Sequence, residues 1–244
     1  MDATLIATEI ESGLRAAATP ERAVNEKAYL KSDLDFIGAT VPATQRVVKD
    51  VLKRHAPVDH GFVVGLAEAL WPNPVHELRM AAVMVLEAKP AALGPADIGL
   101  VERFIRESKT WALVDGLAAT VAGGLVERHP ELGVTLDRWA ADDDFWVRRS
   151  ALLAPLVPLR RGGGDWERFS RHADSMLHEK EFFIRKAIGW VLREVSKKRP
   201  ELVSAWIEPR AARASGVTVR EAVKYLPAPD RDRILAAYKG GAGR

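Results

Sequence analysis

A short pattern that returns at a nearly constant interval limits what this chain of 244 residues can fold into. The pattern is an aliphatic residue, Arg, any residue, then Ala or Ser, and its arginines are Arg79, Arg148, Arg185 and Arg220. The first interval is twice the others, and its midpoint, Val114, lies in a similar Leu-Val-Asp-Gly-Leu stretch. With Val114 included, these five equivalent positions form one column of the repeat alignment. Successive members of the column are 35, 34, 37 and 35 residues apart. This period predicts a helical-repeat solenoid.

The segments between these positions have the apolar spacing of amphipathic helices, and none alternates like a strand. Thr19, Asp59 and Pro95 stand where helices are expected to begin. The signatures of tetratricopeptide and ankyrin arrays are absent, so short HEAT-like helix pairs fit better. We therefore predict an all-α fold, an α-solenoid of HEAT-like helical repeats whose inner helices form a concave cleft. We expect one domain over residues 1–238 and a disordered tail over 239–244.

Composition excludes several classes of protein. There is no cysteine, and the six histidines show no metal-ligand spacing, so neither a metal nor a cofactor is expected. The apolar runs are shorter than the roughly 18 residues of a membrane span, and the N-terminus does not resemble a signal peptide. These features predict a cytoplasmic protein with no membrane partner.

Positive charge gathers in one part of the chain. The net charge is only +3, but residues 145–200 hold 13 Lys or Arg against 6 Asp or Glu. This local excess makes a polyanion a candidate partner. An ordinary solvated helical surface explains the charge equally well.

The stretch Thr110–Val121 places one carboxylate in an otherwise apolar helix. Trp111 and Asp115 are four residues apart and therefore lie on the same side of it. The repeat alignment puts Asp115 in one column with Met80, Arg149, Lys186 and Glu221. Because equivalent positions of successive repeats stack, we expect Arg149 beside Asp115, and Lys186 one repeat further on.

Helical geometry brings a second tryptophan to the same side. At 100° per residue from the arginine column, Trp111 points near ~60°, Asp115, Arg149 and Lys186 near ~100°, and Trp190 near ~140°. A single Trp or a single Asp–Arg pair is more often structural. Convergence of all five within about 80° favours a functional site.

The chemistry available to this group of residues is narrow. There is no nucleophile beside a histidine, and Arg160–Trp166 lacks the Lys-Ser or Lys-Thr ending of a phosphate-binding loop. A carboxylate between indoles stabilises a developing cation, and the neighbouring basic residues would hold phosphates. Cleavage of an N-glycosidic bond in DNA fits these requirements.

At these residues the sequence resembles the bacterial DNA alkylation repair family, the AlkD-type DNA glycosylases, from about Glu21 to Leu226. The strongest match is residues 181–201, EFFIRKAIGWVLREVSKKRPE. Weaker matches are residues 28–46, 108–115, 129–132, 143–153 and 219–226. The chain departs from its relatives at Ala112, where they often have Asp, and at residues 42–45, where they are more polar.

The resemblance implies a positive cleft for duplex DNA and hydrolytic release of cationic N3- or N7-alkylated purines, such as 3-methyladenine and 7-methylguanine. It makes Asp115 the catalytic carboxylate, with Trp111 and Trp190 as aromatic walls. The expected DNA-binding residues are Tyr29, Lys31, Arg46, Arg148, Arg149, Arg185 and Lys186. We expect a monomer that works on the nucleoid. Two alternatives remain open, a non-catalytic DNA-binding solenoid and a HEAT-like scaffold for protein partners.

Overall fold

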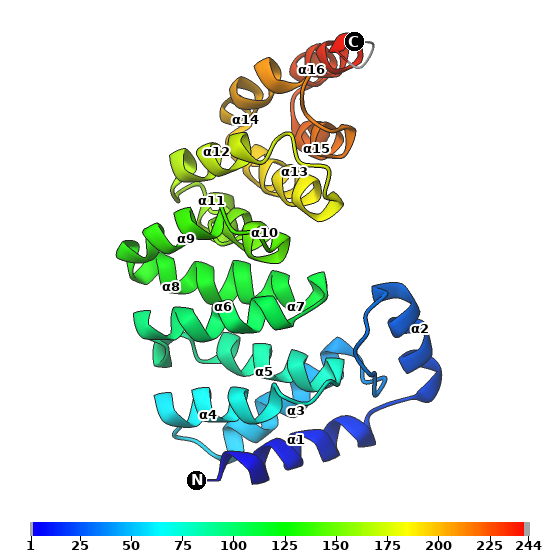
Figure 1. Ribbon diagram of the computed structural model, residues 1–244, viewed down its shortest axis with the longest axis vertical. Coiled ribbons are helices and arrows are strands. Elements are labelled where there is room, and N and C mark those ends of the chain that lie inside the picture. The colour runs from blue at the N-terminus through cyan, green and yellow to red at the C-terminus, as the bar shows by residue number, and fades with distance from the viewer. Residues whose placement is uncertain (1, 242–244) are drawn as a thin grey trace. The chain divides into compact units, whose positions relative to one another are not determined.

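The computed structural model describes residues 2–241, and helices account for nearly all of them (Figure 1). Within that range there is no β-strand, only two isolated bridges that join Ala18 to Ala39 and Asp35 to Val75. The prediction of an all-α fold is confirmed. No described helix is long and apolar enough to cross a membrane.

The chain divides into two compact units, Met1–Val121 and Ala122–Arg244. The single domain predicted over residues 1–238 stays a prediction. The last helix, α16 (Ala228–Gly241), extends into the predicted tail, so residues 239–241 are helical rather than disordered. Ile234, buried on this helix, anchors it, and α16 packs against α14 (Pro200–Ile207) and α15 (Gly216–Ala222). Residues 242–244 of that predicted tail lie outside the described residues.

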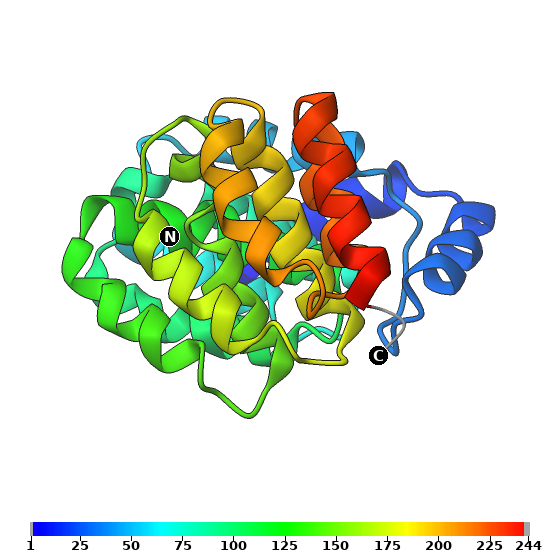
Figure 2. The same ribbon diagram turned by 90° about the horizontal axis from the view of Figure 1, so that it is seen from above.

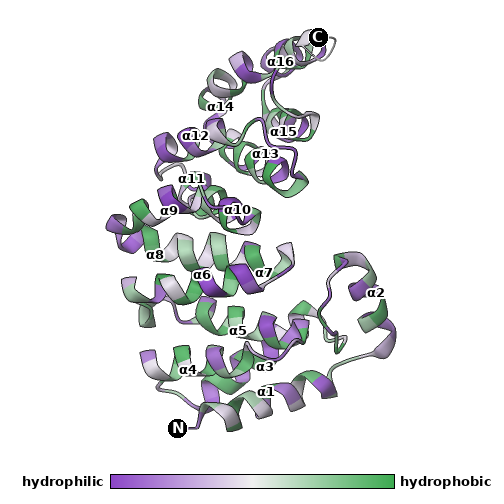
Figure 3. Ribbon diagram, viewed as in Figure 1, coloured by the Kyte–Doolittle hydropathy of each residue, from purple (hydrophilic) through white to green (hydrophobic). Residues whose placement is uncertain are grey.

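The first unit is built around one central helix, α5 (His76–Ala88). It packs against α3 (Val41–Arg54), α4 (His60–Leu70) and α7 (Trp111–Gly116), and α1 (Ala3–Ala16) packs against α3 and α4. The remaining helices of this unit are α2 (Pro20–Leu30) and α6 (Ile98–Glu107). Leu66, Ala81 and Val85 are fully buried at the centre. Figure 3 shows polar and apolar residues alternating along the helices, as expected where only one side is buried.

Helix α2 stands apart from the other helices of its unit (Figures 1 and 2). It has no buried residue, and Val24 and Tyr29 are large side chains that are mostly exposed. The chain on either side holds it in place, since the backbone N–H of Thr19 donates to the carbonyl of Gly38 at 3.2 Å. The position of α2 therefore depends on its two flanking segments rather than on core packing.

A buried carboxylate fixes the segment that follows α2. Glu77, only 2% exposed, accepts hydrogen bonds from the backbone N–H groups of Ile37 at 3.0 Å and Gly38 at 2.5 Å. Gly38 has a φ of +93°, which favours glycine. His76, the residue before Glu77, stacks its ring on Phe36 with the centroids 4.8 Å apart. Burial lowers the pKa of His76 to about 4, so this histidine is neutral at physiological pH.

The helix that carries Asp115 changes its winding one residue after the end of α7. Residues Leu117–Ala122 form a π-helical segment, and α8 (Gly123–Arg128) continues from it. The sequence predicted a regular helix through Val121. A π segment holds one more residue per turn than an α-helix, and such segments occur frequently at functional sites.

The second unit has a row of three packed helices, α10 (Phe145–Leu153), α13 (Phe182–Ser196) and α15. Helices α9 (Gly133–Trp139) and α12 (Trp166–Ser175) pack against α10, α14 packs against α13, and α11 (Leu156–Arg160) packs against α8 and α13. Trp139, Phe169 and Val191 are fully buried. The row thus holds the three later members of the repeat pattern.

Three arginines of the repeat column, one in the first unit and two in the second, make the same kind of contact. Arg79 donates to the backbone carbonyl of Glu107 at 2.6 Å and to that of Trp71 at 3.1 Å. Arg148 donates to the carbonyl of Asp142 at 2.6 Å, and Arg185 to that of Glu179 at 2.7 Å. The contacts of Arg148 and Arg185 each reach the carbonyl six residues earlier, as the contact of Arg79 with Asn73 at 3.3 Å also does, so these three guanidinium groups satisfy backbone carbonyls just before their own helices.

Candidate functional site

The first unit brings together Tyr29 and Trp111, two aromatic residues far apart in the sequence. Their ring centroids are 6.2 Å apart with the planes at 83°, an edge-to-face contact. Trp111 opens α7, and the hydroxyl of Thr110 accepts a hydrogen bond from the N–H of Ala112 at 3.5 Å. Asp115 follows one turn later on the same side of α7 and is partly exposed. Tyr29, Trp111 and Asp115 therefore form one surface.

Close packing of α7 on α5 fixes the position of this surface. A Cβ on Gly116 would lie 2.9 Å from both Glu87 Oε1 and Val83 Cγ1, so a larger residue there would require these two side chains to shift. The hydroxyl of Thr120, in the π-helical segment, hydrogen-bonds Glu87. Burial raises the pKa of Glu87, while the bond from Thr120 opposes that change. The sequence did not single out Glu87, because the equivalent positions of the other repeats carry no acidic residue.

The second unit holds the basic half of the predicted site on α10 and α13. Arg149 is only 3% exposed, and its Nη1 donates to the carbonyl of Phe183 at 2.5 Å. Its guanidinium also lies 5.8 Å from the centre of the Phe183 ring. A side chain so deeply buried offers a phosphate little surface. Its DNA-contacting role stays a prediction, and so does the expected contact between Asp115 and Arg149.

Lys186 and Arg193 share a carboxylate that the prediction did not assign to them. Lys186 Nζ lies 2.5 Å from Glu221 Oε1, and Arg193 Nη1 bonds the other oxygen. Burial by itself would raise the pKa of Glu221, but the hydrogen bond from Lys186 and the charge of Arg193 lower it below its usual range. Glu221 is therefore ionised at neutral pH and neutralises part of the positive surface on α13.

Two other predicted DNA-binding residues have internal partners. Arg148 forms a paired contact with Glu179, from Nε to Oε1 at 2.9 Å and from Nη2 to Oε2 at 2.8 Å. That hydrogen-bonded pair raises the pKa of Arg148. Arg185 bonds the backbone of the same Glu179. These contacts give both arginines a structural role, and their binding to DNA stays a prediction.

The remaining predicted residues lie at the surface. Lys31 is exposed at the C-terminal end of α2 in a left-handed conformation with φ of 49°, and Arg46 is exposed on α3. Trp190 is partly exposed on α13. Among the described residues no group of three or more His, Asp and Glu side chains is arranged to hold a metal ion.

These features define a helical-repeat protein with a carboxylate and aromatic rings on one unit and a partly neutralised basic surface on the other. Comparison with known families gives a more specific assignment. The family model described as DNA alkylation repair enzyme matches residues 10–226. The chain therefore belongs to the DNA alkylation repair enzyme family, and the resemblance inferred from its motifs is confirmed.

Solved structures of related proteins share the fold. A protein described as a predicted DNA alkylation repair enzyme from Enterococcus faecalis is 25% identical, with a TM-score of 0.78 over 86% of this chain and 97% of the other. AlkD2 from Streptococcus mutans is 18% identical, with a TM-score of 0.60 over 84% of this chain and 100% of its own. No curated protein sequence matches the chain.

Proposed function

We propose that this protein is a monofunctional alkylpurine DNA glycosylase that acts as a monomer on duplex DNA in the cytoplasm and needs no cofactor. Its substrates are purines made cationic by alkylation at N3 or N7, such as 3-methyladenine and 7-methylguanine. The observation that carries the proposal is Asp115 one turn after Trp111, with Tyr29 against the indole, in a chain of the DNA alkylation repair enzyme family.

The proposed reaction hydrolyses the bond between C1′ of the deoxyribose and the purine nitrogen. The bonding electrons leave with the alkylated purine, whose positive charge they neutralise, so no general acid is required. The sugar develops positive charge, which the Asp115 carboxylate and the Trp111 ring stabilise. Water then adds to C1′ and loses its proton, for which Asp115 is the base.

The charge of the lesion should therefore decide which bases are released. We expect the wild-type protein to release 7-methylguanine and 3-methyladenine from methylated duplex DNA, but to release an uncharged adduct such as 1,N6-ethenoadenine at least about 100-fold more slowly. Chromatography of the freed bases measures both. Salt-dependent DNA binding without base release would instead identify a non-catalytic DNA-binding protein.

A second prediction concerns the ion pairs of Glu221. Replacing Glu221 with Gln keeps its shape but removes the charge that neutralises Lys186 and Arg193. We expect the variant to bind DNA about three to ten times more tightly. The slope of log affinity against log salt concentration should become steeper by about 0.9, the value for one additional neutralised phosphate. Fluorescence anisotropy with a labelled duplex over a series of salt concentrations measures both quantities.

The matched control is Glu208→Gln, which breaks the ion pair of an exposed arginine, Arg233, and changes the net charge equally. Equal tightening in the two variants would show a general charge effect. Unchanged or weaker binding by Glu221→Gln would contradict the competition between this carboxylate and DNA phosphates.

A further inference from the structure

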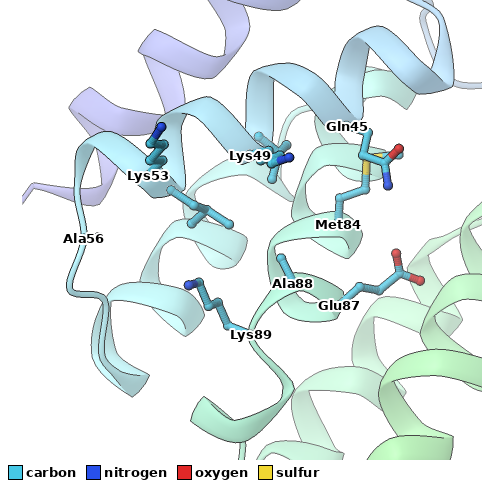
Figure 4. Close-up of a pocket in the computed structure, with 10 residues that line it drawn as sticks. Gln45, Lys49, Lys53, Ala56, Met84, Glu87, Ala88 and Lys89 are labelled. Atoms are coloured by element: carbon cyan, nitrogen blue, oxygen red, sulfur yellow. The ribbon is translucent and has the colours of Figure 1, made fainter.

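A groove of about 560 Å³ lies between α3 and α5 in the first unit (Figure 4). Its apolar lining comes from Val48 and Leu52 of α3 and from Met84 and Ala88 of α5. Lys49, Lys53, Lys89, Gln45 and Glu87 also line it, and in the close-up view the Lys89 side chain extends into the space between the two helices. The groove therefore combines an apolar floor with a cationic rim.

The three lysines differ from several arginines of the first unit. Arg15, Arg54 and Arg103 are each paired with a glutamate. Within residues 2–241, no carboxylate lies within ion-pair distance of Lys49, Lys53 or Lys89. Gln45, Lys49 and Lys53 follow at intervals of four along α3, so they lie about 6 Å apart on one side of it. Three positive charges thus remain for an anionic ligand.

Helical register places the groove on the side of the first unit that carries Asp115. Met80 occupies the Asp115 position of its repeat, and Met84 and Glu87 follow it by four and seven residues on the same side of α5. Glu87 also lies against Gly116 of α7. Since neighbouring helix axes are about 8–10 Å apart, the groove lies about 12–15 Å from the axis of α7.

We infer that this groove holds the sugar–phosphate backbone of one DNA strand, about four nucleotides from the reactive sugar at 3.4 Å per nucleotide. The apolar faces of the deoxyriboses cover the floor, and the phosphates contact Lys49, Lys53 and Lys89. A protein partner is the weaker fit, because three lysines line the groove and lysine is depleted in the cores of protein interfaces. The inference rests on the proposed action on DNA.

The test combines the lysine variants with DNA that carries one neutral methylphosphonate. Replacing Lys49, Lys53 and Lys89 with Gln should weaken binding of a labelled duplex containing 7-methylguanine about 10- to 100-fold at 0.1 M salt. It should also lower the salt slope by about 0.9 for each phosphate that the lysines no longer neutralise. In the wild-type protein, a methylphosphonate about four nucleotides from the lesion should weaken binding, whereas in the triple variant it should have no further effect.

Two controls separate a specific groove from a general charge effect. The double variant Arg15→Gln with Arg103→Gln removes exposed, paired cations on α1 and α6 and should leave the methylphosphonate response intact. Ala88→Glu places a negative charge in the groove and should weaken binding, whereas Ala88→Gln, of similar size, should not.

An unchanged salt slope in the triple lysine variant, or an equal weakening of binding in the double arginine variant, would overturn the inference. A wild-type protein that releases methylated bases while the lysine variants bind normally would leave the proposed function standing without the groove. If the lysine variants bind DNA more weakly but the wild-type protein releases no base, the groove would still be a DNA-binding site, and the proposed glycosylase activity would be wrong.

Discussion

Asp115→Asn should slow the release of 7-methylguanine from methylated duplex DNA by at least about 100-fold under single-turnover conditions. The substitution preserves the size of the side chain but removes the negative charge that stabilises the sugar cation in the proposed mechanism. Loss of one such electrostatic group typically costs 10²- to 10³-fold, or about 3–4 kcal/mol of transition-state stabilisation. Quantifying the freed base over time measures the rate, and anisotropy of labelled DNA, expected to change less than about threefold, measures binding.

The matched control is Asp50→Asn, the same chemical change at an exposed position on α3. It should release the base at the wild-type rate. Equal release by Asp115→Asn and the wild-type protein would remove Asp115 from the mechanism while leaving the helical fold and the family assignment unaffected.

Gly38→Ala should produce the largest structural effect of a single methyl group. At a φ of +93° the new Cβ would lie 2.1 Å from the carbonyl oxygen of Thr19 and 2.9 Å from the backbone nitrogen of Ala23. Because both atoms belong to the backbone, the contact that holds α2 must open, at a cost of about 2–4 kcal/mol. We expect faster proteolysis around α2, a changed environment of Trp111 in fluorescence, and slower base release.

Gly99→Ala provides the comparison, since a Cβ at Gly99 in α6 meets nothing within 4 Å. Alanine there should stabilise the protein by about 0.5–1 kcal/mol through its higher helix propensity. If both variants had the same stability and proteolysis pattern, the Thr19–Gly38 contact would not be what positions α2.

Hydrophobic periodicity was sufficient to predict the all-α fold, because amphipathic helices show their buried sides directly in the sequence. The arginine column was also informative, since Arg79, Arg148 and Arg185 each donate to the backbone carbonyl six residues earlier. The arginine column did not indicate whether those guanidinium groups bond to the backbone of the protein or to a ligand. Residue type and spacing cannot distinguish a carbonyl from a phosphate as a partner.

The candidate site was predicted in part. The spacing of Trp111 and Asp115 placed them together, but Tyr29 lies outside the repeat and only the family resemblance connected it with them. The π-helical segment after α7 has no sequence signature, because its extra residue is accommodated by packing. The pairing of Lys186 with Glu221 follows from the same stacking rule that predicts Arg149 beside Asp115, so the repeat alignment already contained this signal.

Helix α2 has a further consequence for how such a protein can diversify. Most helices of the chain contribute side chains to a core, where exchanging a residue leaves a void or a clash. Helix α2 contributes none and carries the tyrosine that meets Trp111. Substitutions there can alter what approaches the indole with little thermodynamic penalty elsewhere, which makes α2 the most evolvable part of the candidate site.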